Sequence, residues 1–108
     1  MKIEPYDGLT LSENQLKVLC FLAEHYDSFG EGPVYTFKGM AEETKIEVRL
    51  VRLACRALLR KGLAEIAKMW NEESGLYCGS GYVATKNGAD VIERMEELKR
   101  VREEANTL

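Results

Sequence analysis

Four arginines spaced three or four residues apart could do the most specific chemistry in this sequence. They are Arg49, Arg52, Arg56 and Arg60, called the arginine stripe below. An α-helix turns about 100° per residue, so the stripe would fall within about 80° of its surface. A guanidinium group donates paired hydrogen bonds to guanine edges and to phosphates. The spacing therefore predicts a helix face that binds a polyanion.

The apolar residues of the same segment fall on the opposite side of this helix, which predicts a buried face. They are Val51, Ala54, Cys55 and Leu58. An ordinary solvated face is the alternative, but such faces mix charge signs, as Glu96 and Arg100 do near the C-terminus. After Glu47 the stripe's segment has no acidic residue up to Gly62. Contact with a polyanion is therefore the favoured interpretation.

Positive charge is concentrated around the stripe. The chain has a formal net charge of -3, yet residues 45–62 hold six basic side chains and one acidic one. Lys45 precedes the stripe's helix and Lys38 lies in the segment before it, so both extend the basic surface. Local field, rather than net charge, decides where a polyanion docks. The basic surface fits DNA, and two alternatives stay open: an acidic protein partner and RNA.

Other site chemistries find little support. Cys20, Cys55 and Cys78 stand far apart with a single histidine, His25, so we expect reduced thiols and no metal site. No phosphate-binding glycine loop or acid–base constellation is present, so an enzyme and a cofactor are not expected. No apolar run approaches the roughly 20 residues of a membrane helix. With no signal-peptide pattern at the start, a cytoplasmic protein is expected.

The elements that must position the stripe can be traced from caps and breaks. An irregular arm is expected over 1–10, then a helix over 13–25 that Ser12 caps with Gln15. After the Gly- and Pro-containing break at 28–33 we expect a short strand at 34–35. Thr36 caps a helix over 37–43, and Gly62 ends the stripe's helix over 47–61. A strand over 63–70, a turn over 71–75, strand pieces at 76–78 and 81–84 split by Gly79-Ser80, and a helix over 86–104 after Thr85 complete the chain.

Three segments resemble MarR-like transcriptional regulators. Residues 40–47 (MAEETKIE) are similar to the family's L-A-x-x-x-G-V-S turn, residues 60–63 (RKGL) to its K-K-G-L, and residues 82–88 (YVATKNG) to its Y-x-L-T-x-x-G. The resemblance covers residues 11–100. It implies a winged helix-turn-helix, an α+β fold, mainly α with a small β-hairpin, in the order helix, strand, helix, helix, hairpin, helix. It further implies a sequence-specific DNA-binding regulator whose recognition helix spans 47–61.

Under this interpretation the predicted DNA-contacting residues divide by position. Arg49 and Arg52, near the helix start, would reach base edges, whereas Arg56 and Arg60 would meet phosphates. Lys38 and Lys45 complete the predicted set. The effector, if one exists, is not indicated by any residue.

The sequence departs from the family at three places. Lys45 replaces the usual turn glycine, so this turn needs a left-handed or otherwise adjusted non-glycine residue. Glu47 stands where a better cap is usual, and the wing tip, Asn71-Glu72-Glu73, is acidic. Beside the stripe, Leu50 and Ala57 are expected to pack inward, while Leu53 could pack, touch thymine methyls or meet a protein.

The remaining expectations concern the wing and the C-terminus. Trp70 and Tyr77 flank the wing turn and should pack across the strands, in preference to a ligand or redox site near Cys78. The helix within 86–108 extends past what a small core needs, so we expect a homodimer formed by Val91, Met95, Leu98 and Val101. Residues 1–108 are expected to form one domain.

Overall fold

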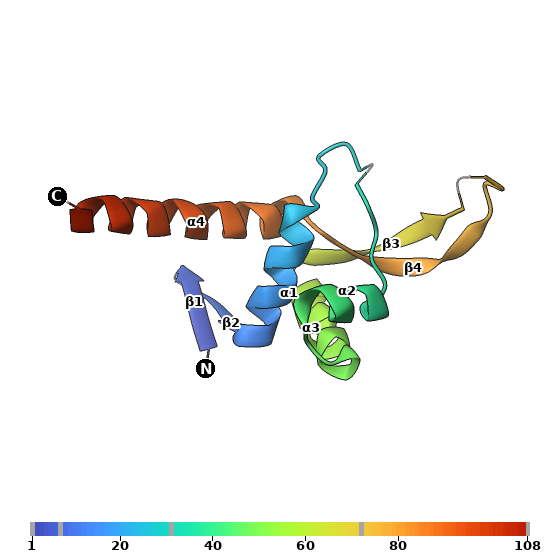
Figure 1. The fold of residues 1–108 in the computed structure, drawn as a ribbon, viewed down its shortest axis with the longest axis horizontal. Coiled ribbons are helices and arrows are strands. Elements are labelled where there is room, and N and C mark those ends of the chain that lie inside the picture. Colours follow the sequence, from blue (N-terminus) through green and yellow to red (C-terminus); the bar gives the residue numbers. More distant parts are fainter. Residues whose placement is uncertain (1, 7, 31, 72, 108) are drawn as a thin grey trace.

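The chain folds into a central body of helices. A long hairpin projects from one end of this body, and a long helix projects from the opposite end (Figure 1). The computed structural model describes residues 2–6, 8–30, 32–71 and 73–107, and the side chains among them from residue 8 to residue 105. The elements are β1 (Lys2–Tyr6), β2 (Leu9–Ser12), α1 (Glu13–Glu24), α2 (Phe37–Thr44), α3 (Val48–Arg60), β3 (Ala64–Trp70), β4 (Tyr77–Ala84) and α4 (Lys86–Thr107).

The core lies where α1, α2 and α3 meet. α3 packs against both α1 and α2, and α4 packs against α1. The largest side chains that are completely buried come from β2 and these three helices: Leu11, Val18, Leu19, Met40, Val51, Cys55 and Leu58. The buried face predicted for the stripe's helix is thus confirmed.

The helix ends follow the chemistry of their caps. Ser12 accepts a hydrogen bond from the Gln15 backbone N–H at 3.1 Å, and the Gln15 side chain accepts one from the Ser12 N–H, as predicted. Thr36 caps α2 through the Gly39 N–H, also as predicted. Gly62, at φ 74°, ends α3, because its left-handed backbone lets the Leu63 N–H reach back to the Leu58 carbonyl.

The wing is the antiparallel hairpin β3–β4. The sequence predicted a return strand split at Gly79-Ser80, and this is wrong: β4 runs unbroken, with Lys68 opposite Ser80 and Met69 opposite Gly79. A register shift between Met69 and Trp70 absorbs the irregularity instead. The expected strand at 34–35 is reduced to a single bridge between Tyr35 and Tyr82.

The N-terminal segment also differs from its prediction. Where an irregular arm was expected over 1–10, β1 and β2 pair antiparallel, with Tyr6 opposite Leu9. Gly8, at φ 89°, supplies the positive φ for this tight connection. Leu11 is completely buried in the core, so burial of a β2 side chain fixes the hairpin to the helices.

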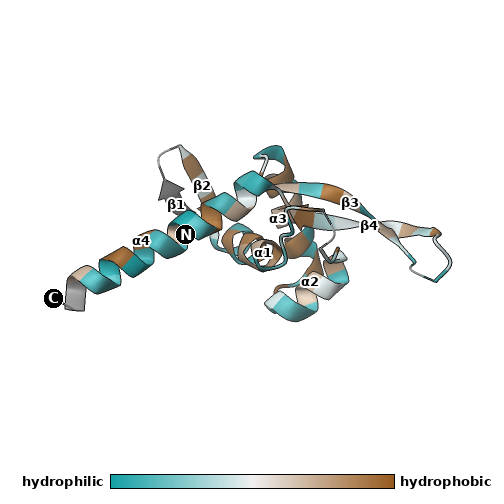
Figure 2. Cartoon of the chain, turned by 90° about the horizontal axis from the view of Figure 1, so that it is seen from above, coloured by the Kyte–Doolittle hydropathy of each residue, from teal (hydrophilic) through white to brown (hydrophobic). Residues whose placement is uncertain are grey.

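α4 begins on the core and then leaves it. Thr85 caps it through the Gly88 N–H at 3.1 Å, and Val91 and Ile92 cover the core. The later turns project beyond the other elements and are mostly hydrophilic, with isolated hydrophobic residues (Figure 2). Among the described residues, no helix is long and apolar enough to cross a membrane.

Candidate nucleic-acid interface

The arginine stripe lies entirely on the exposed side of α3. Arg49, Arg52, Arg56 and Arg60 are all exposed, whereas Val51, Cys55 and Leu58 behind them are completely buried. Burial of the apolar side therefore fixes the rotation of α3 and turns the stripe to solvent. A helix oriented in this way presents several guanidinium groups along one line, as a row of phosphates requires.

One member of the stripe is held by an aromatic contact. The Arg52 guanidinium carbon lies 5.3 Å from the centre of the Phe37 ring, within the range of a cation–π interaction. The Phe37 ring packs in turn on Tyr82 of β4, with 5.5 Å between ring centres. Arg52 is thus positioned by α2 and the wing together. No sequence pattern indicated this contact, because the three residues lie far apart along the chain.

Two of the three departures noted in the sequence, Lys45 and Glu47, lie at the start of α3. Lys45 adopts φ 63° and ψ 28°, so it takes the left-handed one of the two possibilities left open by the sequence, and its N–H reaches the Ala41 carbonyl at 3.0 Å. Glu47 makes no side-chain capping bond to α3. Its carboxylate instead lies 3.8 Å from Arg49, in an exposed pair of little energetic weight. Lys38, in the first turn of α2, and Lys45, just before α3, are both exposed.

The apolar residues beside the stripe separate into two groups. Ala57 is buried and Leu50 packs against the core, as predicted. Leu53, for which three roles were open, is 52% exposed. An apolar side chain is therefore available among the arginines.

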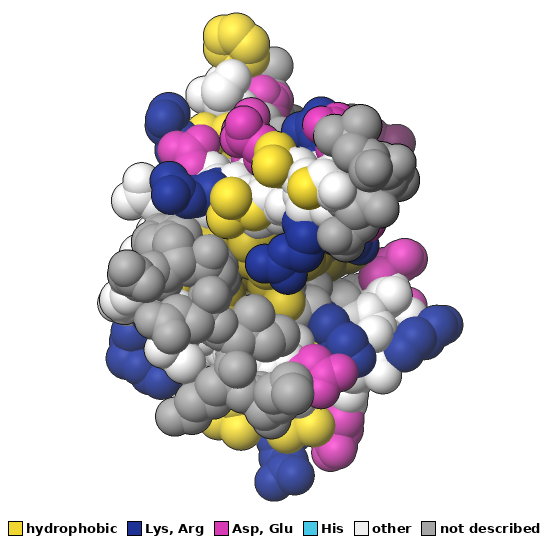
Figure 3. Space-filling view, turned by 90° about the vertical axis from the view of Figure 1, so that its left-hand side faces the viewer, with side chains coloured by type: hydrophobic (Ala, Val, Ile, Leu, Met, Phe, Trp, Pro, Cys, Tyr) yellow, Lys and Arg dark blue, Asp and Glu magenta, His cyan; other side chains and the backbone are white. Residues whose placement is uncertain are grey.

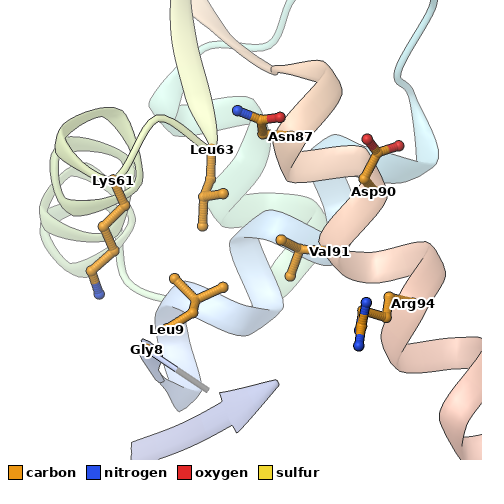
Figure 4. Close-up of a pocket in the computed structure, with 8 residues that line it drawn as sticks. All are labelled: Gly8, Leu9, Lys61, Leu63, Asn87, Asp90, Val91 and Arg94. Atoms are coloured by element: carbon orange, nitrogen blue, oxygen red, sulfur yellow. The ribbon is translucent and has the colours of Figure 1, made fainter. Parts of the chain in front are cut away.

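A lysine at the end of α3 binds the N-terminal hairpin, a contact that the sequence did not reveal. The Lys61 Nζ donates to the Thr10 carbonyl oxygen at 2.6 Å and to Gln15 Oε1 at 3.0 Å. Beside it lies a pocket of about 560 Å³ into which Leu9, Leu63 and Val91 project, with Lys61 and Arg94 on opposite sides (Figure 4). The pocket lies where the N-terminal hairpin β1–β2, the end of α3 and the start of α4 meet.

The tip of the wing is a turn organised by Asn71. Asn71 Oδ1 accepts hydrogen bonds from the N–H groups of Glu73 and Ser74, which closes the turn. Glu73 is exposed, while Glu72 lies outside the described residues. Trp70 and Tyr77 pack across the strands, as predicted, with 5.7 Å between their ring centres.

The three cysteines are free and differ in environment. Cys55 is buried in the core, and this burial raises the pKa of its thiol to about 12. Partial burial also raises the pKa of Cys20, with smaller contributions from Glu96 and Glu24. Cys78 is exposed on the wing. Cys55 and Cys20 thus pack as apolar groups.

The four residues expected at a dimer interface do not share one environment. Val91 is only 2% exposed and belongs to the chain's own core, so its assignment to an interface is wrong. Met95 packs partly against that core. Leu98 and Val101 are 49% and 56% exposed on the projecting turns of α4. From that end of the molecule, hydrophobic side chains are visible among charged ones (Figure 3).

No protein-family model matches the sequence, and no curated protein matches it. Solved structures do. S. aureus MepR bound to ethidium bromide matches with a TM-score of 0.69 at 16% identity, over 95% of this chain and 67% of that one. A mutant of S. aureus MepR bound to an oligodeoxyribonucleotide matches with a TM-score of 0.66 at 18% identity, over 90% and 64%. A MarR family transcription regulator matches with a TM-score of 0.61 at 16% identity, over 91% and 59%.

These similarities, together with the order of elements, define the chain as a winged helix-turn-helix. Its fold is that of the MarR family regulators, as the sequence motifs predicted. The chain spans 64% of the length of the oligonucleotide-bound MepR, so the likeness concerns part of that protein.

Proposed function

We propose that this chain is a sequence-specific DNA-binding transcription regulator that reads the major groove with α3. The observation that carries the proposal is the exposure of all four stripe arginines on the second helix of a helix-turn-helix. In this motif the second helix enters the major groove while the first crosses the DNA backbone. The mutant MepR bound to an oligodeoxyribonucleotide shares this fold.

The side chains would divide the work by position. Arg49 and Arg52, near the N-terminus of α3, are suited to base edges, where arginine pairs bidentately with guanine. The contact of Arg52 with the Phe37 ring restricts its rotamers, so less entropy is lost when it binds. Arg56 and Arg60 would contact phosphates. Lys38 and Lys45 would contact the backbone beside them.

The protein would act as a homodimer through α4. Leu98 and Val101 are exposed three residues apart on turns that cover no core of their own, and a second α4 would bury them. A two-fold dimer would present two copies of α3 to half-sites separated by about 34–36 Å, one turn of DNA.

The test is a titration of random-sequence duplex DNA at two salt concentrations. Four to six phosphate contacts predict that log K falls with log salt at a slope near -4 to -5. Arg52→Ala/Arg56→Ala should weaken binding at least tenfold and flatten that slope. The matched control is Arg100→Ala/Arg102→Ala, which removes two exposed arginines from α4 and should change affinity less than twofold.

Failure of duplex to bind at low salt would refute the proposal, as would equal losses of affinity in the two double variants.

The second candidate function is that of a winged helix that docks an acidic protein through the stripe. It is favoured by the exposed Leu53 among the arginines and by the acidic Glu73 on the wing. Binding of an acidic polypeptide without binding of duplex would select it.

A further inference from the structure

One side of the wing carries exposed apolar and aromatic side chains. They lie close to the acidic tip of the hairpin, which does not suit duplex DNA. Ile66, Trp70 and Tyr77 are each more than half exposed. Lys68 lies between the first two along β3 and is also exposed. Together with Phe37 at the foot of the hairpin, these residues are called the wing face below.

The strand register places the wing face on one side of the sheet. Ile66, Lys68 and Trp70 alternate along β3 and so point the same way. They lie opposite Tyr82, Ser80 and Tyr77. The Tyr77 hydroxyl lies 2.8 Å from the Ser80 hydroxyl, which fixes the orientation of the ring along the strand. The row from Ile66 to Trp70 is about 13 Å long at the usual rise of a strand.

The wing face continues into the arginine stripe. Phe37 and Ile66 line a cavity of about 220 Å³ with Ser80, Gly81 and Tyr82. The Arg52 guanidinium lies over the same Phe37 ring, 5.3 Å from its centre. Two cations, Arg52 and Lys68, therefore share one surface with the rings of Phe37, Trp70 and Tyr77 and with the aliphatic side chain of Ile66.

The combination of exposed rings with cations indicates the chemistry of the occupant. A duplex offers mainly phosphates, sugars and base edges, so it would leave exposed indole and phenol faces unused. A protein interface would place rings at its centre but is depleted in lysine. Unpaired nucleic acid offers what the surface lacks, because each base supplies a π-face and each phosphate a negative charge.

We propose that the wing face binds an unpaired stretch of nucleic acid, with bases stacked on Trp70 and Tyr77 and a phosphate at Lys68. The inference deepens the proposed function and rests on it for the position of the adjoining duplex at α3. The ligand would be a strand that continues from the duplex into an unpaired segment.

The experiment uses the single tryptophan of the chain, Trp70, as the reporter. A dT oligonucleotide should quench Trp70 fluorescence with saturation, because a stacked base is in direct contact with the indole. Heparin, a polyanion without bases, should compete for the cations without this quenching. With a labelled oligonucleotide, Trp70→Ala should weaken binding about tenfold to a hundredfold, and Trp70→Phe should retain most of the affinity.

Matched variants separate stacking from general charge and from exposed rings elsewhere. Lys68→Ala should weaken dT binding several-fold, whereas Lys99→Ala on α4 should not. Phe29→Ala removes an exposed ring from the loop between α1 and α2 and should have no effect. Blunt duplex binding by Trp70→Ala should stay within twofold of the unchanged protein.

The outcomes distinguish this inference from the function on which it rests. Duplex binding that needs Arg52 and Arg56, without quenching by dT, would overturn the wing-face proposal alone. Quenching and binding of dT without duplex binding would overturn the regulator proposal and leave stacking in place. Quenching by an acidic, leucine-rich peptide and not by dT would also overturn the wing-face proposal.

Discussion

The carbonyl oxygen of Leu63 lies so close to Gly88 that a β-carbon on residue 88 would overlap it. Two hydrogen bonds surround this contact: the Thr85 N–H reaches the Leu63 carbonyl at 3.1 Å, and the Thr85 hydroxyl reaches the Gly62 carbonyl at 2.7 Å. The exit of α3 and the start of α4 are thereby fixed to each other. In a dimer formed through α4, this joint would set the distance between the two copies of α3.

Replacement of Gly88 should therefore weaken the joint. Gly88→Ala is expected to lower the free energy of unfolding by about 1–3 kcal/mol, because backbone must move to admit the methyl group. Urea unfolding followed by circular dichroism measures the change. Asn87→Ala, at the exposed neighbouring position, is the control and should stay within about 0.5 kcal/mol. Equal stability of the two variants would contradict the close approach.

Lys45 should show opposite effects on stability and on DNA binding. The left-handed conformation of Lys45 costs a non-glycine residue roughly 1–2 kcal/mol. Glycine would remove this cost, but glycine loses more conformational entropy on folding, which offsets part of the gain. Lys45→Gly is expected to stabilise the fold by about 1 kcal/mol and to weaken duplex binding through the lost charge. Thermal unfolding and DNA titration of the same sample measure both.

The control for this change is Lys17→Gly, a lysine in the middle of α1. Glycine inside a helix costs about 1 kcal/mol, so this variant should be less stable and bind DNA as before. Destabilisation by Lys45→Gly would mean that the left-handed turn is not strained.

The projecting turns of α4 should decide the oligomeric state. Leu98→Glu/Val101→Glu places charge where a second α4 would bury apolar side chains, so the protein should become a monomer near its chain mass of 12.2 kDa. Light scattering after size exclusion measures the mass. Lys99→Glu/Arg100→Glu adds two acids to other sides of the same turns and should leave a dimer. A monomeric unmodified protein at micromolar concentration would refute the dimer.

The thiols should react in the order of their exposure. At pH 8 an aromatic disulfide reagent should modify Cys78 at once and Cys20 slowly, because partial burial and two carboxylates raise the pKa of Cys20. Cys55 should react only after unfolding, since burial raises its pKa to about 12. Native labelling of Cys55 at the rate of Cys78 would contradict its burial.

The same pKa makes stability depend on pH. In the unfolded chain the Cys55 thiol ionises near pH ~8.5, while in the fold it stays protonated to about 12. Its stabilising contribution is therefore complete below pH ~8.5 and declines as the pH rises toward the folded value. Unfolding at pH 8 and pH 10 should show a loss that Cys55→Ala lacks.

Local chemistry made much of this protein readable from its sequence. The residues that end or begin the helices act over three or four positions, so they can be recognised from the sequence. They are the caps Ser12 and Thr36, the C-terminal glycine Gly62 and the left-handed Lys45. The helical spacing of the apolar residues in α3 likewise predicted the exposure of the stripe, because the side that is buried determines the side that is exposed. The elements of the winged helix follow from such short-range signals.

Only tertiary structure decided the contacts between distant segments. It took Val91 into the core, paired β1 with β2, tied Lys61 to Thr10 and placed Phe37 between Arg52 and Tyr82. Each of these contacts depends on packing between segments that lie apart along the chain, so no local sequence pattern indicates it. The sequence by itself thus determined that α3 carries an arginine face, while the fold decided that aromatic rings of α2 and the wing continue that face.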